Sequence, residues 1–387
     1  MQTSMSYIIA ARRSALGRVG GLHRNRRIEV LAAPVINAAL ADCKITPDRV
    51  DEIIVGNATQ GGNPARTIAL ASGLPECAAA FTIDRQCASG LDAIITACRT
   101  ISEGEADIIV AGGAESISTA PWRIAKPKSL YQLPHFLGIE PAMLDESDEP
   151  HQFEASELLS QRLNIAREQQ DAWALRSHMK AQSARDDKRF VGEIVPIKST
   201  PEEARDQSAS ADLDPEHFAS EPPFLPPEGS LTPANTSAMH DGAAMVVIVS
   251  QAVWEELGKP PALRLVSGVS QGVKADNEAG APMEAMRKLY ERTKGFNPKD
   301  IGLVELNETS AAQAIAFGSS LGFDDDLINP DGGAVVRGHP FAAAGAVLVV
   351  RLFSRMARNR DKNRPKYGAC ALGAIGGIGV AALFEAL

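Results

Sequence analysis

The sequence lacks the closely spaced cysteines of disulfide-stapled and zinc-binding proteins. Its five cysteines are scattered along 387 residues and include no CxxC pair: Cys43, Cys77, Cys87, Cys98 and Cys370. An odd, scattered set is typical of proteins from a reducing compartment, so we expect a cytoplasmic protein without disulfides. Because a structural zinc site needs clustered Cys and His ligands, we also expect no metal.

Long apolar runs and blocks of basic residues are missing too. No segment reaches the roughly 20 apolar residues that cross a bilayer, and the first residues form no apolar stretch of signal-peptide length, so we expect no membrane association. The net charge is −9 and no Lys/Arg cluster could follow a phosphate backbone, which argues against nucleic acid as a partner. An acidic protein can still hold an anionic ligand through local cations and helix N-termini.

What the sequence does contain is an alternation of strand-like and helix-like segments. The chain is 44% hydrophobic and long enough for two or three domains with large cores. Strands are predicted over residues 5–13, 50–57 and 106–116, with helical segments between them, and the alternation returns from residue 241 to the C-terminus. This pattern predicts an α/β fold with helices on both faces of a sheet.

The stretch between the two alternating parts is different in composition. Residues 157–186 predict one or two polar-faced helices, and residues 218–230 are rich in proline, which discourages regular structure. So long an insertion is usually functional, although an oligomerisation arm is equally consistent. The expected units are an N-terminal half, a loop domain and a C-terminal half, at 1–115 plus 229–251, 116–228 and 252–387.

An internal repeat relates the two halves. DEIIVGNATQ (51–60) resembles IGLVELNETS (301–310), and about thirty residues after each comes a small-residue turn that opens a helix. One turn carries Cys87 and the other carries His339, and a Gly-rich strand follows each helix. The repeat predicts two similar α/β halves that share one site at their junction, with chance similarity between alanine-rich segments as the alternative.

Cys87 is the first candidate for chemistry. It follows the extended segment 79–86 and precedes Ser89, Gly90 and an apolar helical face. At a helix N-terminus the dipole and the free backbone N–H groups stabilise a thiolate, so we expect a lowered pKa and a nucleophilic sulfur. A buried, inert cysteine is the alternative interpretation.

His339 and Asn307 are the candidates that could assist this cysteine. His339 lies beside Pro340 at the start of a predicted helix, where proline is tolerated, and its imidazole could take the proton of Cys87. Asn307 ends a predicted strand, and its neutral amide could stabilise an oxyanion. A helix-capping or core His and an Asn N-cap are the alternatives.

Five segments in succession resemble the thiolase family along nearly the whole chain. They resemble its nucleophile segment, its GG-x-E-S-M-S strand, its CoA-contacting stretch, its N-E-A-F-A segment and its N-x-x-G-G-A-x-A-x-G-H-P segment. In that order they read CASGLDA, AGGAESIS, GSLTPANTSAMHDGAA, NETSA and DGGAVVRGHPFAAAGA. Several ordered motifs are far more specific than any one of them.

The resemblance implies both a fold and an activity. The fold would be the five-layered α-β-α-β-α thiolase fold, in which two similar βαβαβ-type halves carry an inserted loop domain. The activity would be acyl-CoA acyltransfer through an acyl-Cys87 thioester, as 3-oxoacyl-CoA thiolysis or acetyl-CoA condensation. Acyl-CoA and CoA would be substrates, with no tightly bound cofactor, and the chain would form a homodimer or homotetramer.

The resemblance also implies residue roles. His339 would activate Cys87 and, together with Asn307, hold a water that forms one oxyanion hole. The backbone N–H groups of Cys87 and Ile375 would form the other. On the substrate side, Ser237 would lie against the CoA pantetheine and His151 would line the acyl pocket.

Two positions depart from the family pattern. His240 replaces an Asn of the CoA-contacting stretch. We expect its side chain to lie on the CoA side or at the surface rather than to act as the missing base. Gly373 stands where thiolases carry a second cysteine, counted from Tyr367 in Y-G-x-x-x-x-C-x-G-G-G-x-G. Cys370 lies three residues earlier, and an odd offset on a strand directs it to the opposite face, so it is a poor substitute.

The loss of the second cysteine leaves other functions open. In the family this residue moves the α-proton during C–C bond chemistry, and losing such a group typically costs 10²–10⁴-fold. Acyl transfer onto Cys87 could survive while C–C chemistry falters. A decarboxylative condensing enzyme or an acyl-thioester hydrolase is therefore the alternative, followed by a non-catalytic CoA-binding subunit.

Overall fold

The computed structural model describes residues 5–137, 152–198, 200–209, 214–225, 227, 229–359 and 361–387. Nine strands form one continuous path of hydrogen-bonded neighbours, in the order β11-β12-β13-β10-β1-β9-β5-β3-β4. Their bounds are β1 (Ser6–Ser14), β3 (Glu52–Gly56), β4 (Ala79–Ile83), β5 (Ile108–Glu115), β9 (His240–Ser250), β10 (Leu263–Gly272), β11 (Ile301–Leu306), β12 (Tyr367–Ala374) and β13 (Ile378–Ala386).

The path consists of two half-sheets with the same topology. In the N-terminal half the strand order is β4-β3-β5-β9-β1, and in the C-terminal half it is β11-β12-β13-β10. The position equivalent to β4 is taken in the C-terminal half by a single parallel bridge between Val304 of β11 and Ile328. The halves are joined by the antiparallel pairing of Ile8 with Leu263. The repeat predicted from the sequence is thus a structural repeat.

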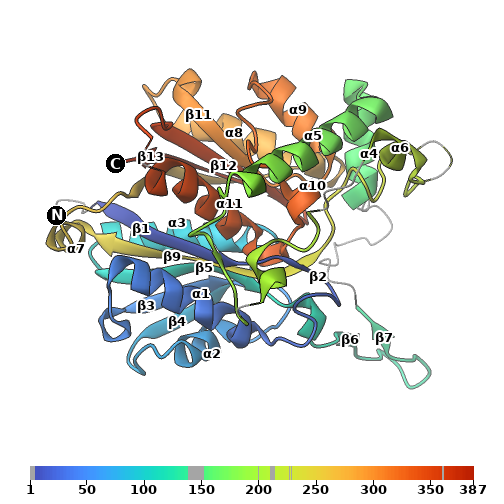
Figure 1. Ribbon diagram of the computed structural model, residues 1–387. Helices are drawn as coiled ribbons and strands as arrows, with labels where there is room; N and C mark the ends of the chain where they lie inside the picture. The colour runs from blue at the N-terminus through green and yellow to red at the C-terminus, as the bar shows by residue number, and fades with distance from the viewer. Residues whose placement is uncertain are drawn as a thin grey trace.

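Helices cover both half-sheets and separate them. The outer helices of the N-terminal half are α1 (Ile28–Cys43) and α2 (Pro64–Ala71), and those of the C-terminal half are α8 (Ala281–Arg292) and α9 (Ala311–Leu321). Between the half-sheets lie α3 (Ser89–Ser102) and α11 (Ala344–Phe353) (Figure 1).

Three apolar cores follow from this layering. One lies between α1, α2 and the first half-sheet, one between α8, α9 and the second, and the largest surrounds α3 and α11. Strands β5 and β9 are buried along their whole length, as expected of strands with helices on both faces. The five-layered α/β fold expected from the sequence is confirmed.

The helix that the sequence predicts to begin near His339 is less regular than expected. A 3₁₀ turn over Phe341–Ala343 precedes α11, and a π turn over Ser354–Arg358 follows it. Close packing accounts for the irregular start, because a Cβ on Gly90 of α3 would lie only 2.8 Å from the carbonyl oxygen of Ala342.

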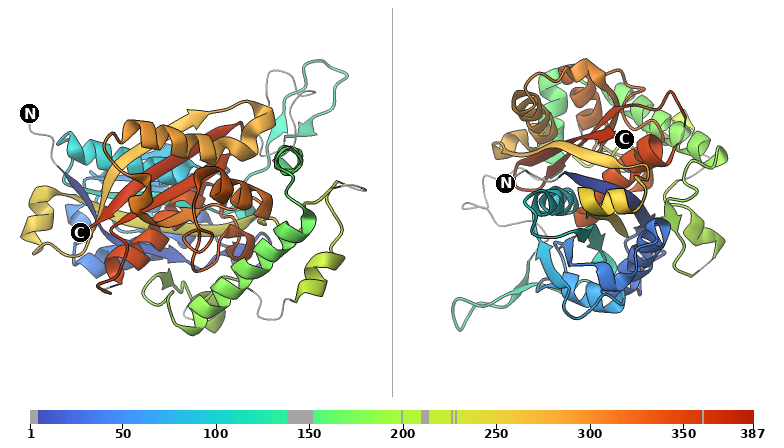
Figure 2. Two further views of the ribbon diagram at one scale, coloured as in Figure 1. Left: turned by 90° about the horizontal axis from the view of Figure 1, so that it is seen from above. Right: turned by 90° about the vertical axis from the view of Figure 1, so that its left-hand side faces the viewer.

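The inserted segment lies along one side of the body. Its helices are α4 (Gln152–Leu163), α5 (Arg167–Asp186) and α6 (Pro215–Ser220), while β6 (Ile124–Ala125) and β7 (His135–Phe136) form a projecting hairpin (Figures 1 and 2). The remaining short elements are β2 (Gly17–Arg18), β8 (Ile194–Val195), α7 (Gln251–Glu256) and α10 (Ala334–Arg337). Among the described helices, none is long and apolar enough to cross a membrane.

Buried ion pairs attach the inserted segment to both halves. Glu193 pairs with Arg13 of β1, with Nε–Oε1 at 2.7 Å, and with Arg351 of α11. Asp206 accepts from Arg13 Nη1 at 2.6 Å, and Arg351 also pairs with Asp331. These five side chains are almost completely buried, so the network holds the segment in one position.

Candidate active site

Cys87 lies in the tight turn between β4 and α3. Gln86 has φ of +52°, a left-handed conformation that is uncommon outside glycine. Ser89 stabilises the turn, because its Oγ accepts from the Arg85 N–H at 2.7 Å and donates to the Gln86 carbonyl at 2.6 Å. The turn places Cys87 two residues before the first residue of α3, with 2% of its surface exposed.

His339 is held by backbone contacts with the other half of the molecule. Its N–H donates to the Ala238 carbonyl at 2.8 Å, and its carbonyl accepts from the His240 N–H at 2.9 Å. The preceding Gly338 has φ of +95°, and a Cβ there would overlap the ring of His240. Only glycine fits at this position, which fixes the direction in which His339 leaves the turn.

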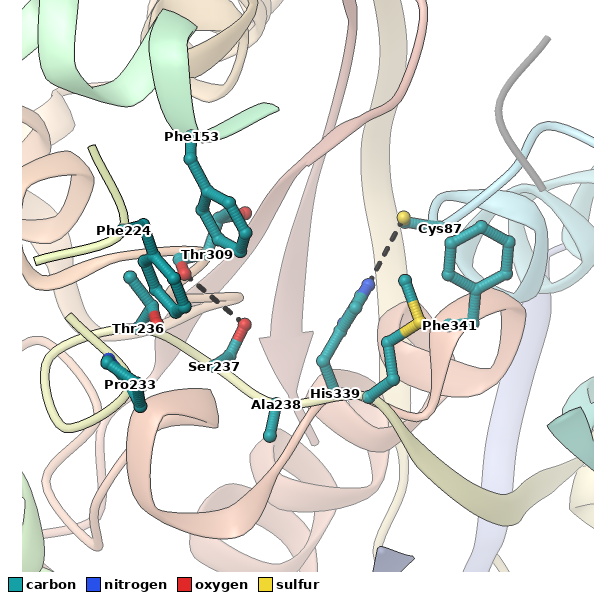
Figure 3. A pocket seen from close by; sticks show the side chains of 11 residues that line it. Cys87, Phe153, Phe224, Pro233, Thr236, Ser237, Ala238, Thr309, His339 and Phe341 are labelled. Atoms are coloured by element: carbon teal, nitrogen blue, oxygen red, sulfur yellow. Dashed lines mark hydrogen bonds between the residues drawn. The ribbon is translucent and has the colours of Figure 1, made fainter. Parts of the chain in front are cut away.

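The three polar residues singled out from the sequence meet in one buried cluster. His339 Nε2 lies 3.1 Å from Cys87 Sγ (Figure 3), and His339 Nδ1 lies 3.2 Å from Asn307 Oδ1. Because the amide oxygen of Asn307 can only accept, Nδ1 carries the proton and Nε2 is free to accept the thiol proton. Asn307 is not an N-cap, since Ser310 caps α9.

The amide nitrogen of Asn307 is left unused by the protein. It is buried and has no hydrogen-bond partner among the described residues. A buried donor without a partner costs about 1–3 kcal/mol. Its position beside the Cys–His pair gives an acyl oxygen or a water a donor to bind.

The expected lowering of the thiol pKa is wrong. Burial raises the pKa of Cys87 to about 12; the backbone N–H groups of Ile375 and of Cys87 itself act in the opposite direction but are outweighed. Burial likewise lowers the pKa of His339 to about 4, with a smaller contribution from His240. The pair in the free protein is therefore a neutral thiol and a neutral imidazole.

A cavity of about 190 Å³ opens beside the pair. Most of its lining is apolar, and Phe153 of α4 stacks on Phe224 at one side with ring centroids 4.3 Å apart. Ser237 lines the cavity as the sequence suggests, and its Oγ donates to the Thr309 carbonyl at 3.3 Å (Figure 3). The cavity suits a thin, largely apolar ligand that ends at Cys87.

A second, much smaller cavity lies on the Gly373 side of Cys87. Its volume is about 10 Å³, close to the space of one water molecule. Gly373 and Ile375, the two residues that the resemblance singles out on this side of Cys87, both line it. A Cβ on Gly373 would find ordinary contacts, with Pro282 Cδ at 3.4 Å and Gln313 Nε2 at 3.6 Å.

Cys370 lies on the other face of β12. Pairing between β12 and β13 runs without a bulge from Tyr367 to Ala374, so the odd offset from Gly373 is preserved. Cys370 packs in the central core, whereas its neighbours Ala369 and Ala371 pack in the core beneath α8 and α9. Burial and the charge of Glu305 also raise the pKa of the Cys370 thiol.

Of the two predicted substrate-side histidines, His240 lies among the described residues and stands apart from this site. His240 is buried beneath Gly338, where Nδ1 donates to the Ala238 carbonyl at 2.8 Å and Nε2 accepts from Ser208 Oγ at 2.6 Å. It lines neither cavity, so the structure does not support the expected CoA contact. His151 lies outside the described residues.

Several lining residues were missed in the sequence. Phe153 and Phe224 belong to the inserted segment, where no periodic pattern distinguishes a lining aromatic from a core one. Glu278 and Gln313 line the small cavity from two different elements. Of these residues, only Glu278 could have been identified from the sequence, because it is an acidic residue in a segment that otherwise reads as a small-residue loop.

Comparison with known proteins agrees with this arrangement. The family model "Thiolase, N-terminal domain" matches residues 6–252, and "Thiolase, C-terminal domain" matches residues 259–386. The chain belongs to the thiolase family. The predicted family and its activity, thiolase-type acyl-CoA acyltransfer, are confirmed.

Individual thiolases resemble the chain over its full length. An acetyl-CoA acetyltransferase of Escherichia coli is 35% identical over 98% of both chains, and one of Allochromatium vinosum is 34% identical over 98% of both. The crystal structure of the Bacillus anthracis acetyl-CoA acetyltransferase covers 100% of both chains with a TM-score of 0.89 and 33% identity.

Proposed function

We propose that this thiolase forms an acyl thioester on Cys87 and passes the acyl group between CoA thioesters. The observation that carries the proposal is the 3.1 Å contact between Cys87 Sγ and the unprotonated Nε2 of His339. Nε2 takes the thiol proton as sulfur attacks the thioester carbonyl, and the leaving CoA thiolate takes that proton back. The neutral resting pair ionises only when substrate is present.

In this arrangement, hydrogen-bond donors are available to stabilise the negative charge that develops on the acyl oxygen. The backbone N–H groups of Cys87 and Ile375 both point at the sulfur, and the unpaired amide of Asn307 lies on the His339 side. Fixed donors in a water-poor site stabilise an oxyanion strongly. The pantetheine of CoA would fill the 190 Å³ cavity along Ser237. We propose a cytoplasmic enzyme with acetyl-CoA or short 3-oxoacyl-CoA as substrate.

Mass spectrometry of the protein after incubation with acetyl-CoA tests this proposal. We expect one acetyl group on the peptide that contains Cys87, none in Cys87→Ser, and an undiminished adduct in the control Cys77→Ser, since Cys77 is exposed. His339→Ala should acylate about 10²–10⁴-fold more slowly. A wild-type protein that no CoA thioester acylates would be a CoA-binding subunit, and the proposal would be lost.

Gly373 favours a second candidate function. Two reactions do not require a thiol at that position. A decarboxylative condensation removes no α-proton, and a hydrolysis needs only water to attack the acyl-enzyme. Product analysis separates these reactions: acetoacetyl-CoA from acetyl-CoA alone identifies the thiolase reaction. Free acetate identifies a hydrolase, and condensation that requires an acyl-CoA with a carboxyl group on its α-carbon identifies the decarboxylative route.

A further inference from the structure

We propose that Glu278 performs the α-proton transfer for which the thiolase family uses a cysteine at the position of Gly373. The inference rests on the proposed function, since it concerns C–C bond formation at acyl-Cys87. It follows from the small cavity that Cys87, Gly373 and Glu278 line together.

Glu278 is the acid/base group that this cavity offers. The described residues around it are Cys87, Ser156, Glu278, Ala279, Thr309, Gln313, Gly373, Ala374 and Ile375. Of these, only Cys87 and Glu278 carry side chains that ionise in the ordinary pH range. Because Cys87 holds the acyl group at this stage, Glu278 is left to move the proton.

The carboxylate of Glu278 is fixed in place by the β12–β13 turn. Its Oε2 accepts from the Gly376 N–H at 3.0 Å and from the Gly377 N–H at 3.2 Å. These residues directly follow Ile375, whose N–H points at the sulfur of Cys87. The carboxylate is close enough that its charge contributes to the raised pKa of Cys87, after burial.

Neighbouring polar groups cannot take this role. Gln313 is an amide without a titratable proton, and it is occupied at both ends: Nε2 donates to the Ala279 carbonyl at 3.0 Å and Oε1 accepts from the Thr309 N–H at 3.1 Å. Cys370 lies in the central core on the opposite face of β12. His339 lines the other cavity.

The proposed step balances without an external reagent. In condensation, a Glu278 carboxylate oxygen takes a proton from the α-carbon of acetyl-CoA, and the C–H electron pair becomes the enolate. The α-carbon attacks the carbonyl of acyl-Cys87, a C–C bond forms, and the C–S bond to Sγ breaks. The departing Sγ takes up the proton that Glu278 gained, so that the thiol and the carboxylate are both restored. In thiolysis the same proton moves in reverse, from Sγ to Glu278 and from Glu278 to the α-carbon of the leaving enolate.

Glu278→Gln separates this catalytic role from a structural one. The amide oxygen of Gln can still accept from Gly376 and Gly377, so the turn and the Ile375 N–H should stay in place. We expect acylation of Cys87 to continue at the wild-type rate. Condensation of acetyl-CoA, and deuterium uptake into its methyl group in D₂O, should both fall by about 10²–10⁴-fold.

The space beside Gly373 supplies a rescue experiment. Because a Cβ fits there without overlap, Gly373→Cys places a thiol at the family's position. The double variant E278Q/G373C should regain deuterium uptake and condensation. Glu284→Gln is the matched charge control and should behave as wild type. Glu284 is a partly exposed residue of α8, and its side chain pairs only with Arg287 in the described structure.

The outcomes distinguish the two proposals. Normal acylation with unchanged deuterium uptake in Glu278→Gln overturns the role of Glu278 and leaves the acyl-enzyme proposal intact. A wild-type enzyme that is acylated but takes up no deuterium leads to the same two conclusions. Loss of acylation in Glu278→Gln would make Glu278 a positioning residue for the Ile375 N–H. Failure of wild-type acylation removes the proposed function itself.

Discussion

At the residue scale, the uncharged state of the Cys87–His339 pair separates this site from one that stores a thiolate. Burial disfavours both ions, so the thiol keeps its proton and the imidazole stays neutral. In the proposed mechanism the nucleophile is generated at the moment of attack, when Nε2 accepts the proton and backbone donors stabilise the developing oxyanion. The free enzyme should therefore resist adventitious oxidation or alkylation at Cys87.

The pH dependence of alkylation tests the neutral pair. With the pKa of Cys87 raised to about 12, the thiolate fraction is small at pH 8 and grows about tenfold per pH unit. We expect the rate of iodoacetamide modification at Cys87, measured by peptide mass spectrometry, to rise without a plateau between about pH 6 and 11. A plateau that begins near neutral pH would reveal a thiolate–imidazolium pair instead.

The sequence predicted which residues meet at the candidate site better than it predicted their electrostatics. Cys87, His339 and Asn307 each stand at the end of a strand or at the start of a helix, and those positions converge when two similar halves face each other. The direction of the Cys87 pKa shift was wrong because burial by both halves has no local signature in the sequence. Glu278 was missed for the same reason: its partners Gly376 and Gly377 lie about a hundred residues away.

At the element scale, buried strands were the most predictable parts. Runs such as IIVAGG in β5 and AAMVVIVS in β9 have helices on both sides and read as continuous apolar segments. The segment after Pro340 was less predictable, since close contact between Gly90 and Ala342 interrupts the helical geometry there. The inserted segment was unpredictable in detail because buried charges, in addition to apolar contacts such as that of Trp173, hold it in place.

Glu193→Gln tests that attachment. Burial raises the pKa of Glu193, but Arg351 and Arg13 outweigh it and lower the pKa to about 2. Removing the charge weakens the contacts of two buried guanidinium groups, of which Arg13 keeps Asp206 and Arg351 keeps Asp331. We therefore expect the free energy of unfolding to fall by about 1.5–3 kcal/mol in urea titrations. The exposed Glu216→Gln should change it by less than about 0.5 kcal/mol.

The same carboxylate predicts how stability depends on pH. Its pKa is lower in the folded than in the unfolded state, so its stabilisation is complete above the unfolded value near 4.5 and is lost as pH falls toward 2. The difference between wild type and Glu193→Gln should therefore shrink below about pH 4.5. A difference that stays constant from pH 7 to pH 3 would contradict an ionic role for Glu193.

At the scale of the whole molecule, the chain combines a repeated body with one inserted segment. We propose residues 1–115 plus 229–251, 116–228 and 252–387 as its units. The body follows from the repeat, since both half-sheets have the same strand order. The arrangement of the two cavities did not follow from the sequence, because their walls combine the inserted segment with both halves.

Self-association is the prediction at this scale. The β6–β7 hairpin projects from the body (Figure 2). Large apolar side chains in and beside it are exposed: Trp122, Leu130, Tyr131, Leu133 and Phe136. Exposed apolar groups in one place mark an interaction surface, so we propose a homodimer or homotetramer. Light scattering should give two or four times the mass of one chain, and Leu130→Asp with Leu133→Asp should lower it. A single-chain mass at every concentration would contradict the proposal.

The backbone bridge between Met239 and His339 has a consequence for how the enzyme loses activity. It ties the imidazole, which the C-terminal half supplies, to the segment that leads into β9 of the N-terminal half. The distance from imidazole to sulfur is therefore set by how the two halves dock. Any mutation or solvent that loosens the central core should abolish turnover before it melts either half, and inactivation should precede the loss of helical circular dichroism.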